Sequence, residues 1–144
     1  MYNEEFDKLK TKMLKYIMYK KRTEREIRQK FSNMDEAMVD DAIEYLKEAG
    51  YINDSNYVER AVQEFININT LSIKEIKYKL ASKGIDSKLT EDYISKHIDE
   101  LEEYEIKCAQ KIYNKKINNS EKIEVINFLR KKGYKENSIK EIEE

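Results

Sequence analysis

Histidine and cysteine are the side chains that most often supply a base, a nucleophile or a soft metal ligand near neutral pH, and each occurs once, as His97 and Cys108. One of each cannot complete a zinc site, although carboxylates could assist. A Cys108–His97 dyad is conceivable, but Cys108 shares the apolar stripe of a predicted helix with Leu101 and Ile112. We therefore expect Cys108 to be a small core residue and His97 a surface or interface residue.

Other catalytic constellations are also missing from the sequence. Carboxylate pairs such as Asp40–Asp41 and Glu102–Glu103 are adjacent in the chain, so on a helix they point to different faces. No glycine-rich phosphate loop follows a strand pattern. The residues predict a protein that is not an enzyme and that uses neither a cofactor nor a metal.

The composition favours an all-helical fold. The 144 residues contain no proline and three glycines, whereas a sheet protein of this size usually needs many such residues in its turns. Mean hydropathy is −0.89, yet 40% of the residues are hydrophobic and their spacing is regular, which argues against disorder. We expect a single domain over residues 1–144.

The three glycines mark helix ends and reveal an internal repeat. Gly50, Gly84 and Gly133 each follow a segment of helical period and precede a large apolar residue, as a left-handed C-terminal cap does. Gly84 and Gly133 are 49 residues apart, and the same offset aligns two capping-box sequences, 23–26 (TERE) and 72–75 (SIKE). A period of this length predicts a stacked helical array.

Helical periodicity predicts nine helices in three sets of three, with repeat boundaries at about 1–50, 51–98 and 99–144. Asp54 is expected to cap the fourth helix, and Ser120 the eighth. The predicted ranges are 4–20, 24–32, 36–49, 55–68, 73–83, 88–98, 100–117, 121–132 and 136–143.

Four stretches then resemble the RecX family. Residues 22–31 (RTEREIRQKF), 46–54 (LKEAGYIND) and 76–85 (IKYKLASKGI) are similar to three of its helix and turn motifs, and 128–134 (FLRKKGY) is a weaker match. Their order and spacing run from about residue 12 to 140. Lys79 stands where the family has a glutamate, and 67–69 (NIN) lacks the basic residues and glycine common there.

The resemblance implies three three-helix repeats and a regulator of the RecA recombinase in homologous recombination and DNA repair. Such proteins lodge in the groove of the RecA filament on single-stranded DNA, inhibit strand exchange and ATP hydrolysis, and favour disassembly. The implied partners are RecA and, weakly or indirectly, the single-stranded DNA within the filament.

The charges alternate along the chain in step with the predicted helices. Basic residues outnumber acidic ones over 1–33, 65–90 and 106–135, and acidic residues outnumber basic ones between them. If the repeats stack in register, the second helices form a basic surface and the third helices an acidic one. Solvated charge on every outer face is the simpler alternative for any single residue.

These two surfaces are the candidate sites. We expect the filament- or DNA-facing basic surface to contain Arg22, Arg25, Arg28, Lys30, Lys74, Lys77, Tyr78, Lys83, Arg130, Lys131 and Lys132. We expect the protein-facing acidic surface to contain Asp40, Asp41, Glu44, Glu91 and Asp92. Tyr78 lies between lysines and is the tyrosine best placed for an exposed contact, whereas Tyr51 and Tyr134 follow glycines and are expected to pack.

Two other classes of function remain open. A helix-turn-helix nucleic-acid-binding module also has three-helix units, but the net charge of −1 gives no bulk attraction to DNA. A helical-repeat adaptor for another protein is the third reading. The sequence shows no signal-peptide core, no apolar run near the roughly 20 residues that span a bilayer, and no internal disulfide, so we expect a cytoplasmic monomer that does not contact membrane.

Overall fold

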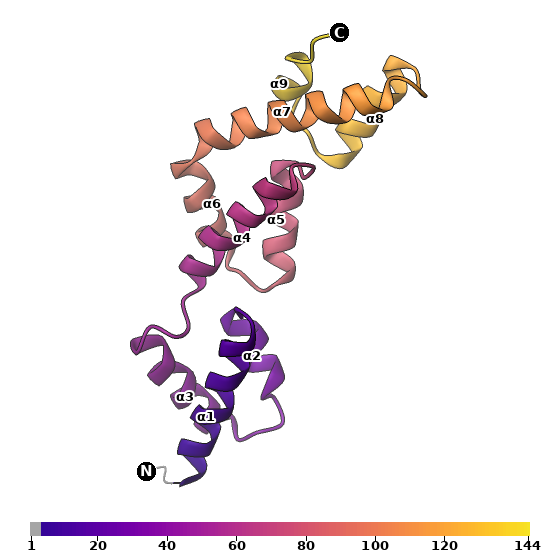
Figure 1. Cartoon of the computed structure of the whole chain (residues 1–144). Coiled ribbons are helices and arrows are strands. Elements are labelled where there is room, and N and C mark those ends of the chain that lie inside the picture. The colour runs from indigo at the N-terminus through magenta and orange to yellow at the C-terminus, as the bar shows by residue number, and fades with distance from the viewer. Residues whose placement is uncertain (1–3) are drawn as a thin grey trace.

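The computed structural model describes residues 4–144, and within this range the protein contains nine helices and no strand. The helices fall into three successive sets of three, as predicted, and together form an elongated stepped array (Figure 1). Their bounds are α1 Glu4–Tyr19, α2 Glu24–Lys30, α3 Glu36–Glu48, α4 Asp54–Ile68, α5 Ile73–Ser82, α6 Ser87–Lys96, α7 Ile98–Lys116, α8 Lys122–Lys132 and α9 Glu136–Lys140.

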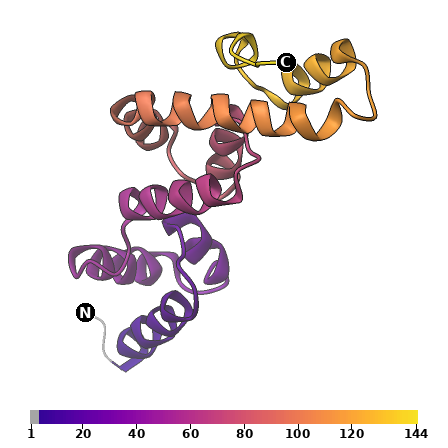
Figure 2. The same cartoon turned by 45° about the horizontal axis from the view of Figure 1, so that its top comes forward.

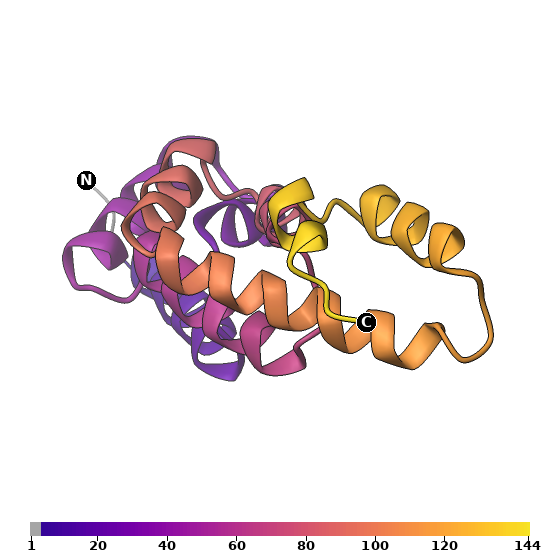
Figure 3. The same ribbon diagram turned by 90° about the horizontal axis from the view of Figure 1, so that it is seen from above.

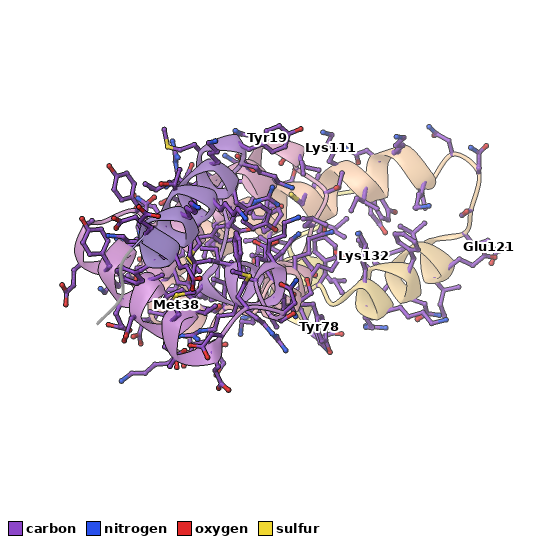
Figure 4. The ribbon with its side chains drawn as sticks, turned by 90° about the horizontal axis from the view of Figure 1, so that it is seen from below. Tyr19, Met38, Tyr78, Lys111, Glu121 and Lys132 are labelled. Atoms are coloured by element: carbon purple, nitrogen blue, oxygen red, sulfur yellow. The ribbon has the colours of Figure 1, made fainter. Side chains whose placement is uncertain are left out.

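The sets rise one above the other, with the first helix of each forming a long step (Figure 2). Seen from above, α7 and α8 run side by side away from the rest of the molecule (Figure 3). Glu121 lies in the turn at the far end of this arm (Figure 4). The α2, α5 and α8 helices lie along one side of the array, and α3 and α6 lie along the other (Figure 1).

Local sequence explains most helix starts. Thr23 and Ser72 each accept a hydrogen bond from the backbone N–H three residues on, and the glutamate at that position returns a bond to the cap, completing both predicted capping boxes. Two predicted caps are wrong. Asn53, rather than Asp54, caps α4, and Glu121, rather than Ser120, precedes α8 without a capping bond from its side chain.

The glycine caps form as predicted. Gly50, Gly84 and Gly133 follow or close α3, α5 and α8 with φ of +84°, +85° and +103°. In the left-handed region a Cβ atom crowds the following carbonyl, so glycine is the residue that ends these helices at little cost. After Gly50 the residue that packs is Ile52, which is buried, while Tyr51 remains half-exposed. Tyr134 is buried, as expected.

The buried apolar residues form two clusters. One joins α1, α2 and α3 through residues that include Leu9, Ile27 and Ile43. The other is continuous through α4 to α9 and includes Val62 and Leu129. Since burial of apolar surface is the main favourable contribution to folding, the second and third sets share a core that the first set does not join.

Candidate filament-binding surface

Three short helices stack end to end along one side of the molecule, and we call α2, α5 and α8 together the helix column. The Thr23 hydroxyl at the start of α2 donates to the carbonyl oxygen of Lys83 at the end of α5, at 2.6 Å. The Ser72 hydroxyl at the start of α5 donates to the carbonyl of Lys132 at the end of α8, at 2.9 Å. Each cap therefore satisfies a terminal carbonyl of the next set as well as a terminal N–H of its own helix.

An ion pair reinforces each of these joints. Lys83 lies 3.6 Å from the Glu26 carboxylate, and Lys132 lies 2.8 Å from that of Glu75. Glu26 and Glu75 are the same glutamates that close the capping boxes. One carboxylate thus binds the start of its own helix and the lysine that ends the helix of the following set.

The glycine at each joint is needed for close approach as well as for its backbone angle. A Cβ atom on Gly84 would lie 2.1 Å from Cδ of Arg25, and one on Gly133 would lie 2.9 Å from Cβ of Lys74. By contrast, a Cβ atom on Gly50 would meet nothing within 4 Å. The stems of Arg25 and Lys74, both predicted as part of the basic surface, therefore pack over glycines at the joints.

All of these joint residues correspond at the 49-residue offset of the sequence repeat. The end of α2 and the start of α8 lack most of them, although Glu124 stands where the joints have their glutamate. Met34 and Asp35 stand where the joints have lysine and glycine, and Glu121 and Ile123 stand where they have the hydroxyl residue and the basic residue. The chemistry of the joint is therefore confined to the two internal positions.

A buried carboxylate backs the second joint. Glu105 of α7 is fully buried and accepts hydrogen bonds from Ile73 N at 2.8 Å, Lys135 N at 3.0 Å and the Ser138 hydroxyl at 2.8 Å. It thus binds the first turn of α5 and the start of α9 at once. Sequence reasoning did not identify Glu105, although its place on the apolar stripe between Leu101 and Cys108 was a signal that it would be buried.

Asp54 has the corresponding role at the first joint. Its carboxylate accepts the Glu24 N–H at 3.0 Å, so it binds the first turn of α2 instead of capping α4. Burial raises the pKa of Asp54, and the bond from the Glu24 amide opposes that shift only in part. Both joints therefore use an acidic side chain from the next set to bind the start of a column helix.

The candidate basic residues differ in how freely they face solvent. Lys74 and Tyr78 are exposed on α5, with Tyr78 projecting away from the body of the molecule (Figure 4). Lys131 is exposed on α8, and like Lys74 it forms no ion pair with the described residues. Arg22 and Lys30 instead lie over the Tyr16 ring, 4.0 and 5.6 Å from its centroid.

The basic and acidic candidates meet along the edge between the second and third helices. Arg28 binds Asp40, Lys77 lies 3.1 Å from Glu91, and Arg130 binds Glu136. The bond from Asp40 raises the pKa of Arg28, so this guanidinium stays charged. Glu44 lies 3.6 Å from Lys47. Asp41 and Asp92 are exposed and make no ion pair with the described residues.

A network of charges covers the first set. Glu24 binds Arg28 and Lys47, each at 3.0 Å. Burial alone would raise the pKa of Glu24, but the bonds from Lys47 and Arg28 outweigh it, and the pKa is lowered. The carboxylate is therefore ionised over the whole physiological range.

Cys108 and His97 take part in separate contacts. Cys108 is buried in the core, as predicted, and its thiol donates to the Asn69 side chain at 3.3 Å. Burial raises the pKa of the thiol, which lowers its reactivity. His97 lies between α6 and α7, where its ring stacks on Tyr93 at 4.3 Å between centroids. Among the described residues, no three His, Cys, Asp or Glu side chains form a possible metal site.

Tyrosine hydroxyls hold the segment between α4 and α5. Tyr104 donates to the carbonyl of Leu71 and Tyr134 to that of Thr70, both at 2.7 Å. These bonds place Ser72 against the end of α8.

Within the described part of the chain, no helix has the length and apolar character needed to cross a bilayer.

The sequence was compared with family models and with curated proteins. No family model matches the sequence, but several curated proteins do. The chain is 34% identical over 104 residues to regulatory protein RecX of Streptococcus agalactiae serotype III, covering 71% of this chain and 40% of that protein. It is 32% identical over 139 residues to regulatory protein RecX of Clostridium perfringens strain SM101, covering 91% of this chain and 65% of that protein. The chain thus spans about half the length of the curated relatives it matches.

Solved structures agree with these relatives. The crystal structure of RecX from Lactobacillus salivarius superposes with a TM-score of 0.79 at 28% identity, covering 95% of this chain and 93% of that one. A second crystal structure of regulatory protein RecX gives a TM-score of 0.80 at 26% identity, covering 95% of this chain and 72% of that one. Both the sequence relatives and the nine-helix fold place this chain in the RecX family of regulatory proteins.

Proposed function

We propose that this protein is a non-catalytic regulator that binds the RecA filament on single-stranded DNA and inhibits or remodels it, thereby limiting strand exchange and ATP hydrolysis. The observation that carries the proposal is the helix column, because it places basic helices from three successive sets along one side of an elongated molecule. Family membership supports RecA as the partner, and the column supports one side of the molecule as the surface that meets it.

A stacked array suits a partner that is itself a repeating polymer. Each set contacts mainly its neighbours, so the array presents similar elements at regular intervals, as solenoid proteins do. The net charge of −1 gives no long-range attraction to DNA. Binding must therefore come from local contacts, with exposed column lysines such as Lys131 toward phosphate and the unpaired Asp41 and Asp92 toward basic protein surface.

The same arrangement disfavours the helix-turn-helix alternative. Such modules place the N-terminal residues of a recognition helix on base edges in the major groove. In α2 and α5 the first turns are bound to Asp54 and Glu105 and are covered by the end of the next column helix. These turns cannot enter a DNA groove without opening the joints.

We place the regulator in the cytoplasm, as a monomer.

The test is RecA-dependent ATP hydrolysis on single-stranded DNA with and without this protein, measured beside its binding to the bare DNA. We expect inhibition at substoichiometric amounts and weak binding to bare DNA. The double substitution Lys74→Glu and Lys79→Glu should weaken inhibition, because both lysines are exposed on α5 and free of ion pairs with the described residues. Lys83 is left intact because it binds Glu26 at a joint.

The matched control reverses two lysines on the opposite helix of the same set. Lys88→Glu with Lys96→Glu on α6 changes the net charge equally, and both side chains are exposed. Inhibition should be retained in this control. Unaltered inhibition by the α5 variant would remove the second set from the proposed surface, and equal weakening by both variants would point to bulk charge instead of a specific face.

A further inference from the structure

An apolar cavity opens on the outer side of α5, beside the proposed surface. It has a volume of about 520 Å³ and lies between α5, the start of α6 and the chain that follows α8. Ile73, Ala81 and Ile85 contribute its apolar lining, and the exposed Tyr78 ring stands at its edge. Its size falls in the range of cavities that accept a small ligand or anchoring side chains.

Two positions that line the cavity in the middle set are charged at the corresponding place in another set. In the first set the position of Ile73 is taken by Glu24, which is bound to Arg28 and Lys47. In the third set the position of Ala81 is taken by Arg130, which binds Glu136 across the same face. At one lining position in each outer set, a charged side chain thus replaces the aliphatic side chain of the middle set.

The charges around the opening indicate what would enter it. Lys74, Lys77 and Lys135 line the rim together with one carboxylate, Glu91. Lys77 is neutralised by Glu91 at 3.1 Å, whereas Lys74 and Lys135 form no ion pair with the described residues. An apolar floor with an unbalanced positive rim is complementary to an apolar side chain flanked by carboxylates.

We propose that this cavity is an anchor site for an acidic protein segment, which inserts a large apolar side chain between α5 and α6 while its carboxylates meet Lys74 and Lys135. The inference rests on the proposed function, in which the partner is a protein filament, and it gives the chemistry of one contact. A nucleic-acid strand fits less well, since Glu91 stands in the α6 wall of the cavity and would repel a phosphate.

Ala81→Glu is the sharpest substitution, because Ala81 is exposed on α5 and a glutamate there places a negative charge in the cavity without disfavouring the helix. Ser82→Glu is its control: Ser82 is the adjacent exposed residue, gains the same charge and does not line the cavity. Circular dichroism should give the same helix content for both variants.

The first measurement is the affinity of fluorescently labelled protein for RecA filaments on single-stranded DNA. We expect Ala81→Glu to weaken binding at least about tenfold, the loss of one buried anchor, and Ser82→Glu by less than about twofold. If the unsubstituted protein does not bind filaments, the proposed function fails. If it binds and Ala81→Glu binds equally well, the anchor site alone is overturned.

The second measurement does not depend on RecA. Isotope-labelled protein is titrated with the synthetic peptide acetyl-Asp-Glu-Leu-Phe-Glu-Asp-amide, with the same peptide carrying Ser-Ser in place of Leu-Phe, and with an eight-nucleotide thymidine strand. The first peptide should shift the amide signals of Ala81, Ile85 and Gly133, and the shifts should be absent in Ala81→Glu. Equal shifts with the serine peptide, or stronger ones with the oligonucleotide, would overturn the proposal.

Discussion

The two joints of the helix column share their chemistry but differ in what lies behind them. Each has a hydroxyl cap bound to a terminal carbonyl, a lysine–glutamate pair and a glycine under a basic stem. The second joint lies over a continuous apolar core and is bound by the fully buried Glu105. The first lies between two separate cores and is bound by the partly buried Asp54.

Two joints with the same local sequence can therefore couple their neighbouring sets to different degrees during unfolding. The second and third sets should unfold as one cooperative unit because they share buried apolar surface. The first set is attached mainly by polar contacts, which contribute less net stability because water competes for the same groups. We expect it to open first, and the variants below test that order.

The largest effect should come from Glu105→Gln. The amide keeps the shape of the side chain but turns one acceptor into a donor. This donor then faces the N–H and O–H groups that donate hydrogen bonds to Glu105. We expect about 3 kcal/mol of destabilisation, confined to the second and third sets. Urea unfolding measures it, with Glu103→Gln as the exposed control on the same helix. A change as small as that of the control would mean that the second joint is not anchored by Glu105.

Substituting glycine should separate backbone strain from contact at the joints. Gly50→Ala should cost about 1 kcal/mol, the strain of a left-handed alanine with no neighbour in the way. Gly84→Ala should cost more, because its Cβ atom would also displace Arg25 and push the first two sets apart. Thermal unfolding measures both, and equal losses would show that the close approach at Gly84 does not matter.

Removing the cap hydroxyls should show whether the joints differ in coupling. Thr23→Ala and Ser72→Ala each remove a helix cap and a bond between sets, with an expected loss of about 2 kcal/mol. Amide hydrogen exchange should then quicken in α1–α3 for Thr23→Ala and throughout α4–α9 for Ser72→Ala. Ser82→Ala is the exposed control. The same exchange pattern in both variants would contradict two separate units.

The smallest effect concerns the pH dependence of the first joint. The pKa of Asp54 is raised on folding, mainly by burial, so the folded state holds its proton more tightly than the unfolded chain. Its ionisation therefore lowers stability as the pH rises through the pKa of Asp54 in the folded state. Asp54→Asn keeps an oxygen acceptor for Glu24 N–H, and its stability relative to the unsubstituted protein should increase as the pH rises through that pKa. A gain that does not change with pH would exclude this cause.

Sequence reasoning predicted the parts of this fold that depend on local chemistry. Capping boxes at Thr23 and Ser72, and left-handed caps at the three glycines, specify helix ends from neighbouring residues alone. The 49-residue offset gave the repeated sets. What it missed are contacts between distant residues: the second partner of each cap, the position of Asp54 and the burial of Glu105.

The candidate surface was predicted by residue type, and its finer structure follows from packing. The sequence grouped lysines and arginines by helix, but only coordinates separate Lys74, which is unpaired among the described residues, from Lys83, which is held by Glu26. The cavity in the middle set was equally inaccessible to pattern reasoning, since it lies where Ile73 replaces Glu24 of the first set and Ala81 replaces Arg130 of the third.

The ends of the helix column have a consequence for self-association. A module that binds its own neighbour through matching ends could in principle add copies of itself without limit, as open filaments do when an interface does not close. Here Asp35 replaces the glycine at one end, and Glu121 replaces the hydroxyl at the other. Two copies of α2 and α8 brought together in this way would place two carboxylates at the contact, so we expect this joint not to propagate from one molecule to the next.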